Sequence, residues 1–180
     1  FAALAGLILP ALFFYLMNMF RNTVDTETDL KQLSTIPFLG SIALRSKKDR
    51  IVIKSNSRSA VAEMFRLLRT NLQFVLGDAK SPVILVTSGV SGEGKTFISA
   101  NLGMTMALSG KRTVVLGLDL RKPKLGQYLG EGTPPFGITH YLIGQADADA
   151  IIMSSPQSEH LHYIATGPLP DAIRRSVLPN

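Results

Sequence analysis

The sequence predicts an α/β domain with an open, mainly parallel sheet, preceded by one transmembrane helix. Three observations carry this prediction. A glycine-rich phosphate-binding motif lies between an apolar run and a helical pattern, a second β-branched run follows it, and the first 20 residues are almost wholly apolar. Short apolar strands that alternate with helical segments are typical of α/β proteins.

Residues 1–20 form the predicted transmembrane helix. Asn18 is the one clearly polar side chain among these 20 residues, and a helix of this length spans a hydrocarbon core of roughly 30 Å. A signal peptide and a buried core helix are the alternatives. A signal peptide needs a basic start and a small-residue cleavage site, which the segment before Arg21 lacks. A core helix is rarely apolar on every side.

Residues 21–56 are predicted to form a juxtamembrane linker. Its cytosolic placement follows from the nucleotide motif further on, because ATP is a cytosolic ligand. Residues 36–40 (Ile-Pro-Phe-Leu-Gly) predict a turn in an extended connector. The basic stretch 45–58 either contacts anionic lipid headgroups or forms a solvated linker, and the sequence leaves both open.

Residues 60–75 are predicted to form an amphipathic helix. Glu63, Arg66 and Arg69 recur every three residues outside its apolar stripe. They form either a local ion-pair ladder or a contact surface for a neighbouring subunit. The stripe consists of Val61, Met64, Phe65, Leu68, Leu72 and Val75.

Residues 89–96 read Gly-Val-Ser-Gly-Glu-Gly-Lys-Thr, a complete motif for binding a nucleoside triphosphate with magnesium. The apolar run 83–86 predicts a buried strand before it, and the spacing of Ile98, Leu102 and Met106 predicts a helix after it. The glycines allow backbone N–H groups to turn toward the phosphates.

The cofactors predicted for this motif are ATP and Mg²⁺. Lys95 is expected on the β- and γ-phosphates, and the Thr96 hydroxyl is expected on the magnesium ion. The residues predicted to contact the nucleotide are Gly89, Ser91, Gly92, Glu93, Gly94, Lys95, Thr96 and Phe97.

A second strand is predicted over residues 112–118, and Asp119 follows it directly. A carboxylate at the end of a parallel strand beside a phosphate loop is where such folds place a magnesium or water-orienting group. An ordinary turn aspartate is the alternative. Further on, residues 137–144 predict a short helix and residues 161–165 a third strand.

Composition excludes several classes of site. The 180 residues contain no cysteine, which excludes disulfides, thiol catalysis and cysteine-based zinc sites. The three histidines lack metal-type spacing with carboxylates. The formal charge of +6 does not by itself indicate nucleic acid, and no nucleic-acid partner is predicted.

Taken together, these segments resemble the bacterial tyrosine autokinases (BY-kinases) of capsule and exopolysaccharide export that are fused to a chain-length determinant, or polysaccharide co-polymerase. Residues 1–20 resemble the family's second membrane helix, and residues 36–42 resemble its connector. Residues 63–72 are similar to its E-x-x-R-x-x-R oligomerisation segment. Residues 87–96 match its Walker A segment, and residues 114–123 its Walker A′ segment.

The resemblance implies an autokinase anchored in the bacterial inner membrane, with the kinase part in the cytosol. Subunits of such proteins assemble as a ring, in which one subunit phosphorylates the tyrosine-rich tail of the next and so regulates polymer export. The implied division is a transmembrane helix over 1–20, a linker over 21–56, and the N-terminal part of a P-loop NTPase-like tyrosine kinase domain over 57–180.

The resemblance also implies roles for individual residues. The catalytic residues would be Lys95, Asp119 and Arg121, of which Arg121 would help with developing charge. Thr96 and Asp119 would bind magnesium. The oligomerisation residues would be Glu63, Arg66 and Arg69.

The sequence departs from the family pattern at three places. Gly117 stands where the first aspartate of Walker A′, the base for the tyrosyl proton, is expected. Residues 171–174 read Asp-Ala-Ile-Arg in place of the family's P-x-P-S-E-L segment. No Walker B strand or tyrosine cluster precedes Asn180, so we expect a truncated sheet and no phosphoacceptor tail.

Two other functions remain open on the sequence alone. The first is a partition-type membrane ATPase switch, which has a second lysine just after the first glycine of the loop, where this chain has Val90. The second is a chain-length scaffold that binds ATP without transferring phosphate, which Gly117 keeps open.

Overall fold

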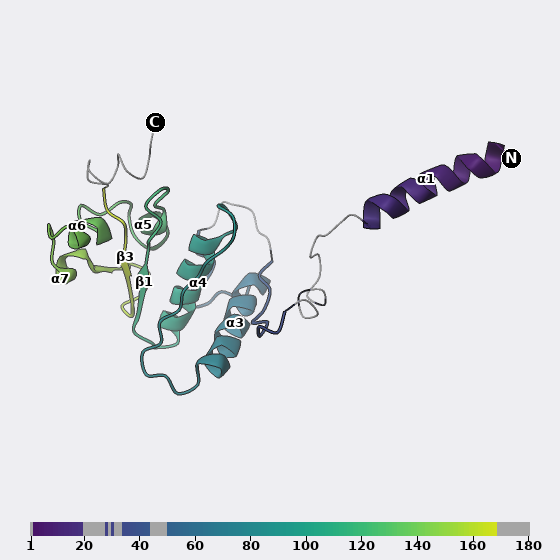
Figure 1. The fold of residues 1–180 in the computed structure, drawn as a ribbon. Coiled ribbons are helices and arrows are strands. Elements are labelled where there is room, and N and C mark those ends of the chain that lie inside the picture. The colour runs from purple at the N-terminus through teal and green to yellow at the C-terminus, as the bar shows by residue number, and fades with distance from the viewer. Residues whose placement is uncertain (1, 20–27, 29, 31–33, 44–49, 169–180) are drawn as a thin grey trace. The chain divides into compact units, whose positions relative to one another are not determined.

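The computed structural model describes residues 2–19, 28, 30, 34–43 and 50–168 (Figure 1). The chain divides into two compact units, residues 1–38 and 39–180. The first contains helix α1 and the second contains the elements from α3 to β3. Residues 45–49 of the basic stretch and residues 171–174 lie outside the described residues.

Helix α1 spans Ala2–Met19 and includes Pro10. The prediction of a helix over residues 1–20 is therefore confirmed as to its secondary structure. Within the part of the chain that the structure describes, no helix is both long enough and apolar enough to cross a membrane. The membrane-spanning role stays a prediction.

Helix α3 spans Ala60–Leu76, in agreement with the helix predicted over 60–75. It begins at Ser59, whose side-chain oxygen accepts a hydrogen bond from the Ala62 N–H at 3.2 Å. It ends at Gly77, which has the positive φ of 56° that favours glycine at a helix end. Val61, Phe65 and Leu72 of its apolar stripe are buried, whereas Val75, near the end of the helix, is 58% exposed. The Phe65 ring meets the Phe97 ring edge-on at 5.7 Å.

Helix α4 spans Lys95–Leu108, and most of its residues from Ala100 to Ala107 are buried. Asn101, on this helix, is fully buried. Its Oδ1 accepts from the Val52 N–H at 2.8 Å, and its Nδ2 donates to the carbonyls of Arg50 at 3.0 Å and Phe97 at 2.9 Å. One amide therefore fixes the extended segment 50–53 against α4.

The sheet contains strands β1 (Thr113–Leu116), β2 (Met153–Ser154) and β3 (Leu161–Ile164), in the order β1-β3-β2. β1 and β3 are parallel, as predicted, whereas the short β2 is antiparallel to β3. Helix α4 packs closely on β1 at Gly103, where an added Cβ would lie 2.5 Å from Val115 Cγ2. A glycine at this position permits the close contact between helix and sheet.

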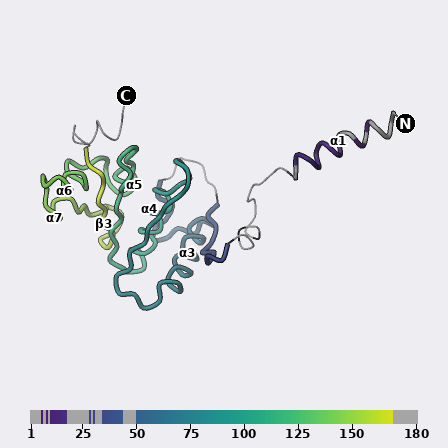
Figure 2. The backbone as a smooth tube through the Cα atoms, viewed as in Figure 1, coloured from purple at the N-terminus to yellow at the C-terminus, as the bar shows by residue number. Residues whose placement is uncertain are grey.

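A short connection joins the end of α4 to the start of β1, and the two elements run in opposite directions (Figure 1). The backbone tube shows the same reversal of the chain after α4 (Figure 2). The start of α4 and the end of β1 therefore lie at the same end of the domain. Three short helices complete the fold: α5 (Leu125–Leu129), α6 (Ile138–Leu142) and α7 (Ala148–Ile151). Helix α6 confirms the short helix predicted within residues 137–144.

The prediction of a buried strand at residues 83–86 is wrong. These residues belong to no strand, and the side chains of Val83 and Leu85 are 96% and 80% exposed. Strand burial depends on cross-strand partners. Among the described strands, β1 pairs with β3 alone, so no neighbouring strand covers this run.

Replacing Asn101 with Ala should lower the free energy of unfolding by about 3 kcal/mol, because it leaves the buried Val52 N–H and the Arg50 carbonyl without partners. The measurement is urea-induced unfolding followed by circular dichroism. Asn56→Ala removes an amide from an exposed turn and serves as the matched control. Equal unfolding midpoints for the two variants would contradict the structural role assigned to Asn101.

Candidate functional site

The phosphate-binding motif forms a loop that leads directly into α4. Gly92 and Gly94 have φ angles of 95° and 96°, in the left-handed region that side-chain-bearing residues rarely adopt. Gly94 immediately precedes the first residue of α4, Lys95. The unpaired N–H groups and partial positive charge of a helix start favour an anion at this position. The local geometry is therefore the one that the motif predicts.

The Lys95 side chain folds back over the loop. Its Nζ donates to Ser88 Oγ at 2.6 Å and to the Val90 carbonyl at 3.1 Å. Ser88 Oγ in turn donates to the Val90 carbonyl at 3.0 Å. Ser88 is thus a member of the site that the sequence prediction left out, although it lies directly before the first glycine of the motif.

Glu93 points back into the same loop. The Val90 N–H donates to Glu93 Oε2 at 3.2 Å. This hydrogen bond, followed by the neighbouring Ser88 side chain and the charge of Lys95, lowers the pKa of the exposed Glu93 carboxyl below its ordinary value of 4.5. Because the folded pKa is the lower one, the contribution of Glu93 to the loop is present at neutral pH and is lost as the pH falls through that lowered value.

Asp119 lies just beyond the end of β1, where the prediction placed it. Its Oδ1 accepts from the backbone N–H groups of Arg121 at 3.1 Å and Lys122 at 3.0 Å, which caps the turn. The carboxylate is exposed and lies at the same end of the domain as the phosphate loop. Among the residues with described positions, no hydrogen bond or ion pair joins it to that loop.

The close packing of the chain around position 117 accounts for the glycine found there. Its N–H donates to the Ile164 carbonyl at 2.9 Å, which continues the ladder between β1 and β3. An added Cβ would lie 3.0 Å from the Cβ of Leu125, the first residue of α5. A side chain at this position is therefore accommodated only if α5 shifts slightly.

The remaining predicted residues divide into two groups. The Phe97 side chain packs in the core against Phe65, which leaves only its backbone for contact with a nucleotide. The oligomerisation residues lie on α3, where Glu63 forms an ion pair with Arg66. Arg69 does not continue this pair into a ladder, because its Nε is buried without a hydrogen-bond partner.

Comparison with known proteins agrees with this site. Residues 84–134 match the family model described as the CobQ/CobB/MinD/ParA nucleotide binding domain. The chain is 30% identical over 121 residues to the tyrosine-protein kinase YwqD of Bacillus subtilis, covering 67% of this chain and 50% of YwqD. It is 37% identical over 112 residues to the succinoglycan biosynthesis transport protein ExoP of Rhizobium meliloti, covering 62% of this chain and 13% of ExoP.

Solved structures give the same result. The BceF tyrosine kinase domain superposes with a TM-score of 0.70 at 25% identity, over 84% of this chain and 66% of that one. The chimerical protein CapA2B2 superposes with a TM-score of 0.71 at 28% identity, over 83% of this chain and 64% of that one.

The homologues of this chain are bacterial tyrosine-protein kinases. These kinases share its P-loop NTPase-like fold, which confirms the predicted fold class of the nucleotide-binding part. The chain spans 50% of YwqD and 13% of ExoP, so it corresponds to a part of each of these relatives.

Replacing Glu93 with Gln should tighten the binding of ATP by about twofold to fivefold, the size of one screened surface charge interaction. The variant removes a negative charge from the phosphate loop and weakens the hydrogen bond from the Val90 N–H, because an amide oxygen is a weaker acceptor than a carboxylate. The measurement is titration with a fluorescent ATP analogue at low salt, and the gain should shrink at high salt.

The control is Glu159→Gln, which removes an exposed carboxylate beside His160. This residue lies at the end of the sheet opposite the phosphate loop, because the His160 carbonyl accepts a hydrogen bond from Thr113, the first residue of β1. Weaker ATP binding by the Glu93 variant than by the control would contradict the role given to this carboxylate.

Proposed function

We propose that this chain is the ATP-binding part of a protein-tyrosine autokinase that regulates the polymerisation and export of exopolysaccharide or capsule. The observation that carries the proposal is the geometry of residues 89–96: a glycine loop at the start of α4 with Lys95 folded over it. The kinase names of its relatives support the reaction, and the description of ExoP supports the link to polysaccharide transport.

The reaction would proceed by positioning and charge neutralisation, because phosphoryl transfer needs little covalent chemistry from the protein. Lys95 and the loop N–H groups would hold the phosphates of ATP. Arg121, next to the turn capped by Asp119, would stabilise charge that develops during transfer.

Magnesium fits the oxygen ligands at this end of the domain. Both backbone N–H groups that hydrogen-bond to the Asp119 side chain donate to its Oδ1. The Oδ2 atom of this exposed carboxylate would therefore remain for a cation. Thr96, in the first turn of α4, supplies a hydroxyl. Hydroxyl and carboxylate oxygens are ligands that Mg²⁺ prefers, and the ion would neutralise charge on the phosphates.

The cellular arrangement is part of the proposal. Residues 1–20 would anchor the protein in the bacterial inner membrane, a role supported by their apolar composition, and the linker and kinase parts would lie in the cytosol. Subunits would associate in a ring through Glu63, Arg66 and Arg69, with the tyrosine tail of a neighbouring subunit as the phosphate acceptor and the polysaccharide export machinery as the partner.

A second candidate function is an ATP-binding scaffold that sets polymer length without transferring phosphate. Gly117 favours it, because the resemblance places the base for the tyrosyl proton at that position. A partition-type switch has one observation in its favour, the MinD and ParA names in the matching family model. Val90, in place of a second lysine, argues against it.

Replacing Lys95 with Met in the full-length protein should abolish phosphotyrosine formation from γ-labelled ATP with magnesium. The variant removes the cation that faces the phosphates. Lys111→Met, at the other end of α4, removes an exposed lysine and should leave the label unchanged. ATP binding without any phosphotyrosine in the unmodified protein would instead favour the scaffold.

Replacing Gly117 with Asp should raise the rate of phosphotyrosine formation at least about tenfold over that of Gly117→Ala, because a positioned general base contributes about 10²-fold or more. Both variants press a Cβ against Leu125, so their comparison removes the steric cost and isolates the carboxylate. The rates are measured at saturating ATP. Equal rates would mean that the chain uses another proton acceptor.

A further inference from the structure

The carboxyl ends of β1 and β3 lie next to each other, at the end of the domain that carries the phosphate loop. The two strands are parallel and paired, with Leu116 opposite Ile164, so the chain leaves both of them in the same direction. After β3, the Thr166 hydroxyl donates to the carbonyls of Gly117 at 3.3 Å and Asp119 at 3.4 Å. The residues that follow β3 are therefore neighbours of the Walker A′ segment.

Helix α6 begins against the end of β3. The residue before its first turn is Gly137, where an added Cβ would overlap the backbone of Gly167. Thr139 is fully buried, and its hydroxyl donates to the Thr166 carbonyl at 2.9 Å. These contacts bring the next residue, His140, to the same end of the sheet as the phosphate loop.

The His140 ring is held from two sides. The Phe136 ring meets it edge-on at 5.5 Å, and its Nδ1 lies 3.3 Å from Thr139 Oγ1. Because the single hydroxyl proton of Thr139 is donated to the Thr166 carbonyl, Oγ1 accepts from His140, and Nδ1 carries the ring proton. Nε2 is then the unprotonated nitrogen, and no hydrogen bond from the described residues occupies it.

A proton acceptor is what the Walker A′ segment of this chain lacks. Position 117 is a glycine, where the resemblance places the base for the tyrosyl proton. An unprotonated imidazole nitrogen accepts a proton near neutral pH, and histidine is the residue most often used as a general base. Paired strands lie roughly 5 Å apart, so a base at the end of β3 is close to a group that reacts over the end of β1.

We propose that His140 is the general base of the phosphoryl transfer and accepts the tyrosyl proton at its Nε2. This inference rests on the proposed function. The tyrosyl oxygen bonds to the γ-phosphorus of ATP while the bond from that phosphorus to the β–γ bridging oxygen breaks, and ADP leaves with the electron pair of that bond. The tyrosyl proton passes to Nε2 and then to solvent, which reaches the partly exposed ring.

The gain expected for Gly117→Asp is unchanged by this role. A carboxylate at position 117 would stand at the end of β1 itself, whereas the imidazole of His140 acts from the neighbouring strand. The new carboxylate would therefore take the proton in place of the histidine. This makes Gly117→Asp the background in which the histidine is no longer needed.

The test is a double-mutant cycle on the full-length protein, which measures phosphotyrosine formation from γ-labelled ATP with magnesium. His140→Asn should lower the rate at least about tenfold when position 117 is glycine, because a positioned general base contributes about 10²-fold or more. In the Gly117→Asp background, the same substitution should change the rate by less than about twofold, because the carboxylate accepts the proton. Asparagine keeps a polar group near the position of Nδ1, where it can still pair with Thr139.

His160→Asn is the matched control. It removes a histidine at the opposite end of the sheet, where the His160 carbonyl accepts from the first residue of β1, and should leave the rate unchanged. Binding of a fluorescent ATP analogue is measured for every variant. It should be the same in His140→Asn as in the unmodified protein, because the proposed role of the histidine is confined to the tyrosyl proton.

An unchanged rate in His140→Asn would overturn the inference and leave the proposed kinase activity standing. An equal loss in the glycine and aspartate backgrounds would also overturn it, because the histidine would then only support the fold around α6. The absence of phosphotyrosine in the unmodified protein would remove the proposed function itself, and the role of His140 with it.

Discussion

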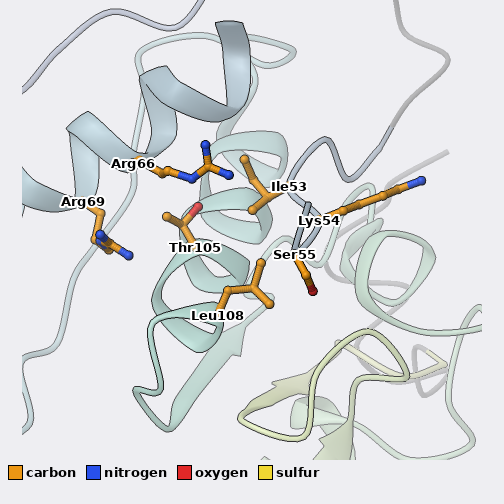
Figure 3. A pocket seen from close by; sticks show the side chains of 7 residues that line it. All are labelled: Ile53, Lys54, Ser55, Arg66, Arg69, Thr105 and Leu108. Atoms are coloured by element: carbon orange, nitrogen blue, oxygen red, sulfur yellow. The ribbon is translucent and has the colours of Figure 1, made fainter. Parts of the chain in front are cut away.

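The hydrogen bonds of one buried amide, Asn101, position the rest of the domain. Helix α4 carries the phosphate loop at its start, packs on α3 through Phe97 and lies on the sheet through Gly103. Asn101 joins the extended segment 50–53 to the middle of this helix. Because the amide is fully buried and makes three hydrogen bonds, a slip of the segment along the helix would leave polar groups unpaired in the core. The same segment continues into residues 53–55, which line a cavity beside α3 and α4 (Figure 3).

Features that depend on nearby residues could be predicted from the sequence. Helix α3 follows from the spacing of its apolar residues. The phosphate loop follows from the spacing of its glycines, because the backbone angles at Gly92 and Gly94 are set locally. The predicted strand at residues 83–86 failed because a strand requires a partner, and partners are not visible in a local pattern. The two-residue strand β2 is too short to leave any pattern.

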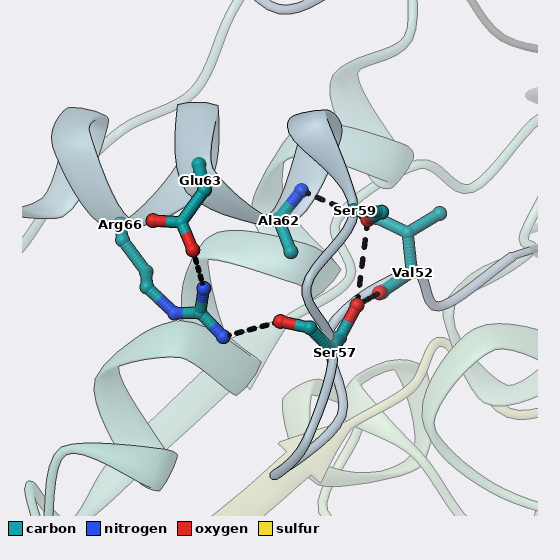
Figure 4. Close-up of polar contacts among 6 residues, drawn as sticks. All are labelled: Val52, Ser57, Ser59, Ala62, Glu63 and Arg66. Atoms are coloured by element: carbon teal, nitrogen blue, oxygen red, sulfur yellow. Dashed lines mark hydrogen bonds and ion pairs between the residues drawn. The ribbon is translucent and has the colours of Figure 1, made fainter.

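The same distinction applies to the candidate sites. Lys95 and Asp119 were predicted as site residues from their positions in motifs. Ser88 was left out because its contact depends on how the Lys95 side chain folds back over the loop. The difference between Arg66 and Arg69 could not be predicted either. The sequence presents them as equivalent members of one repeat. In the structure Arg66 pairs with Glu63 and the Ser57 carbonyl (Figure 4), whereas the Nε of Arg69 is buried without a hydrogen-bond partner among the described residues.

Because β2 is only two residues long, the two edges of the sheet differ in how well they can pair with another strand. On one side β3 is covered by only the two residues Met153–Ser154, which offer few backbone groups to any further strand. On the other side β1 presents a longer strand whose outward side chains, Val114 and Leu116, are about half exposed. An additional strand, from this polypeptide or another, would therefore join at β1, beside the turn that carries Asp119. Completion of the sheet and completion of the site would then be a single event.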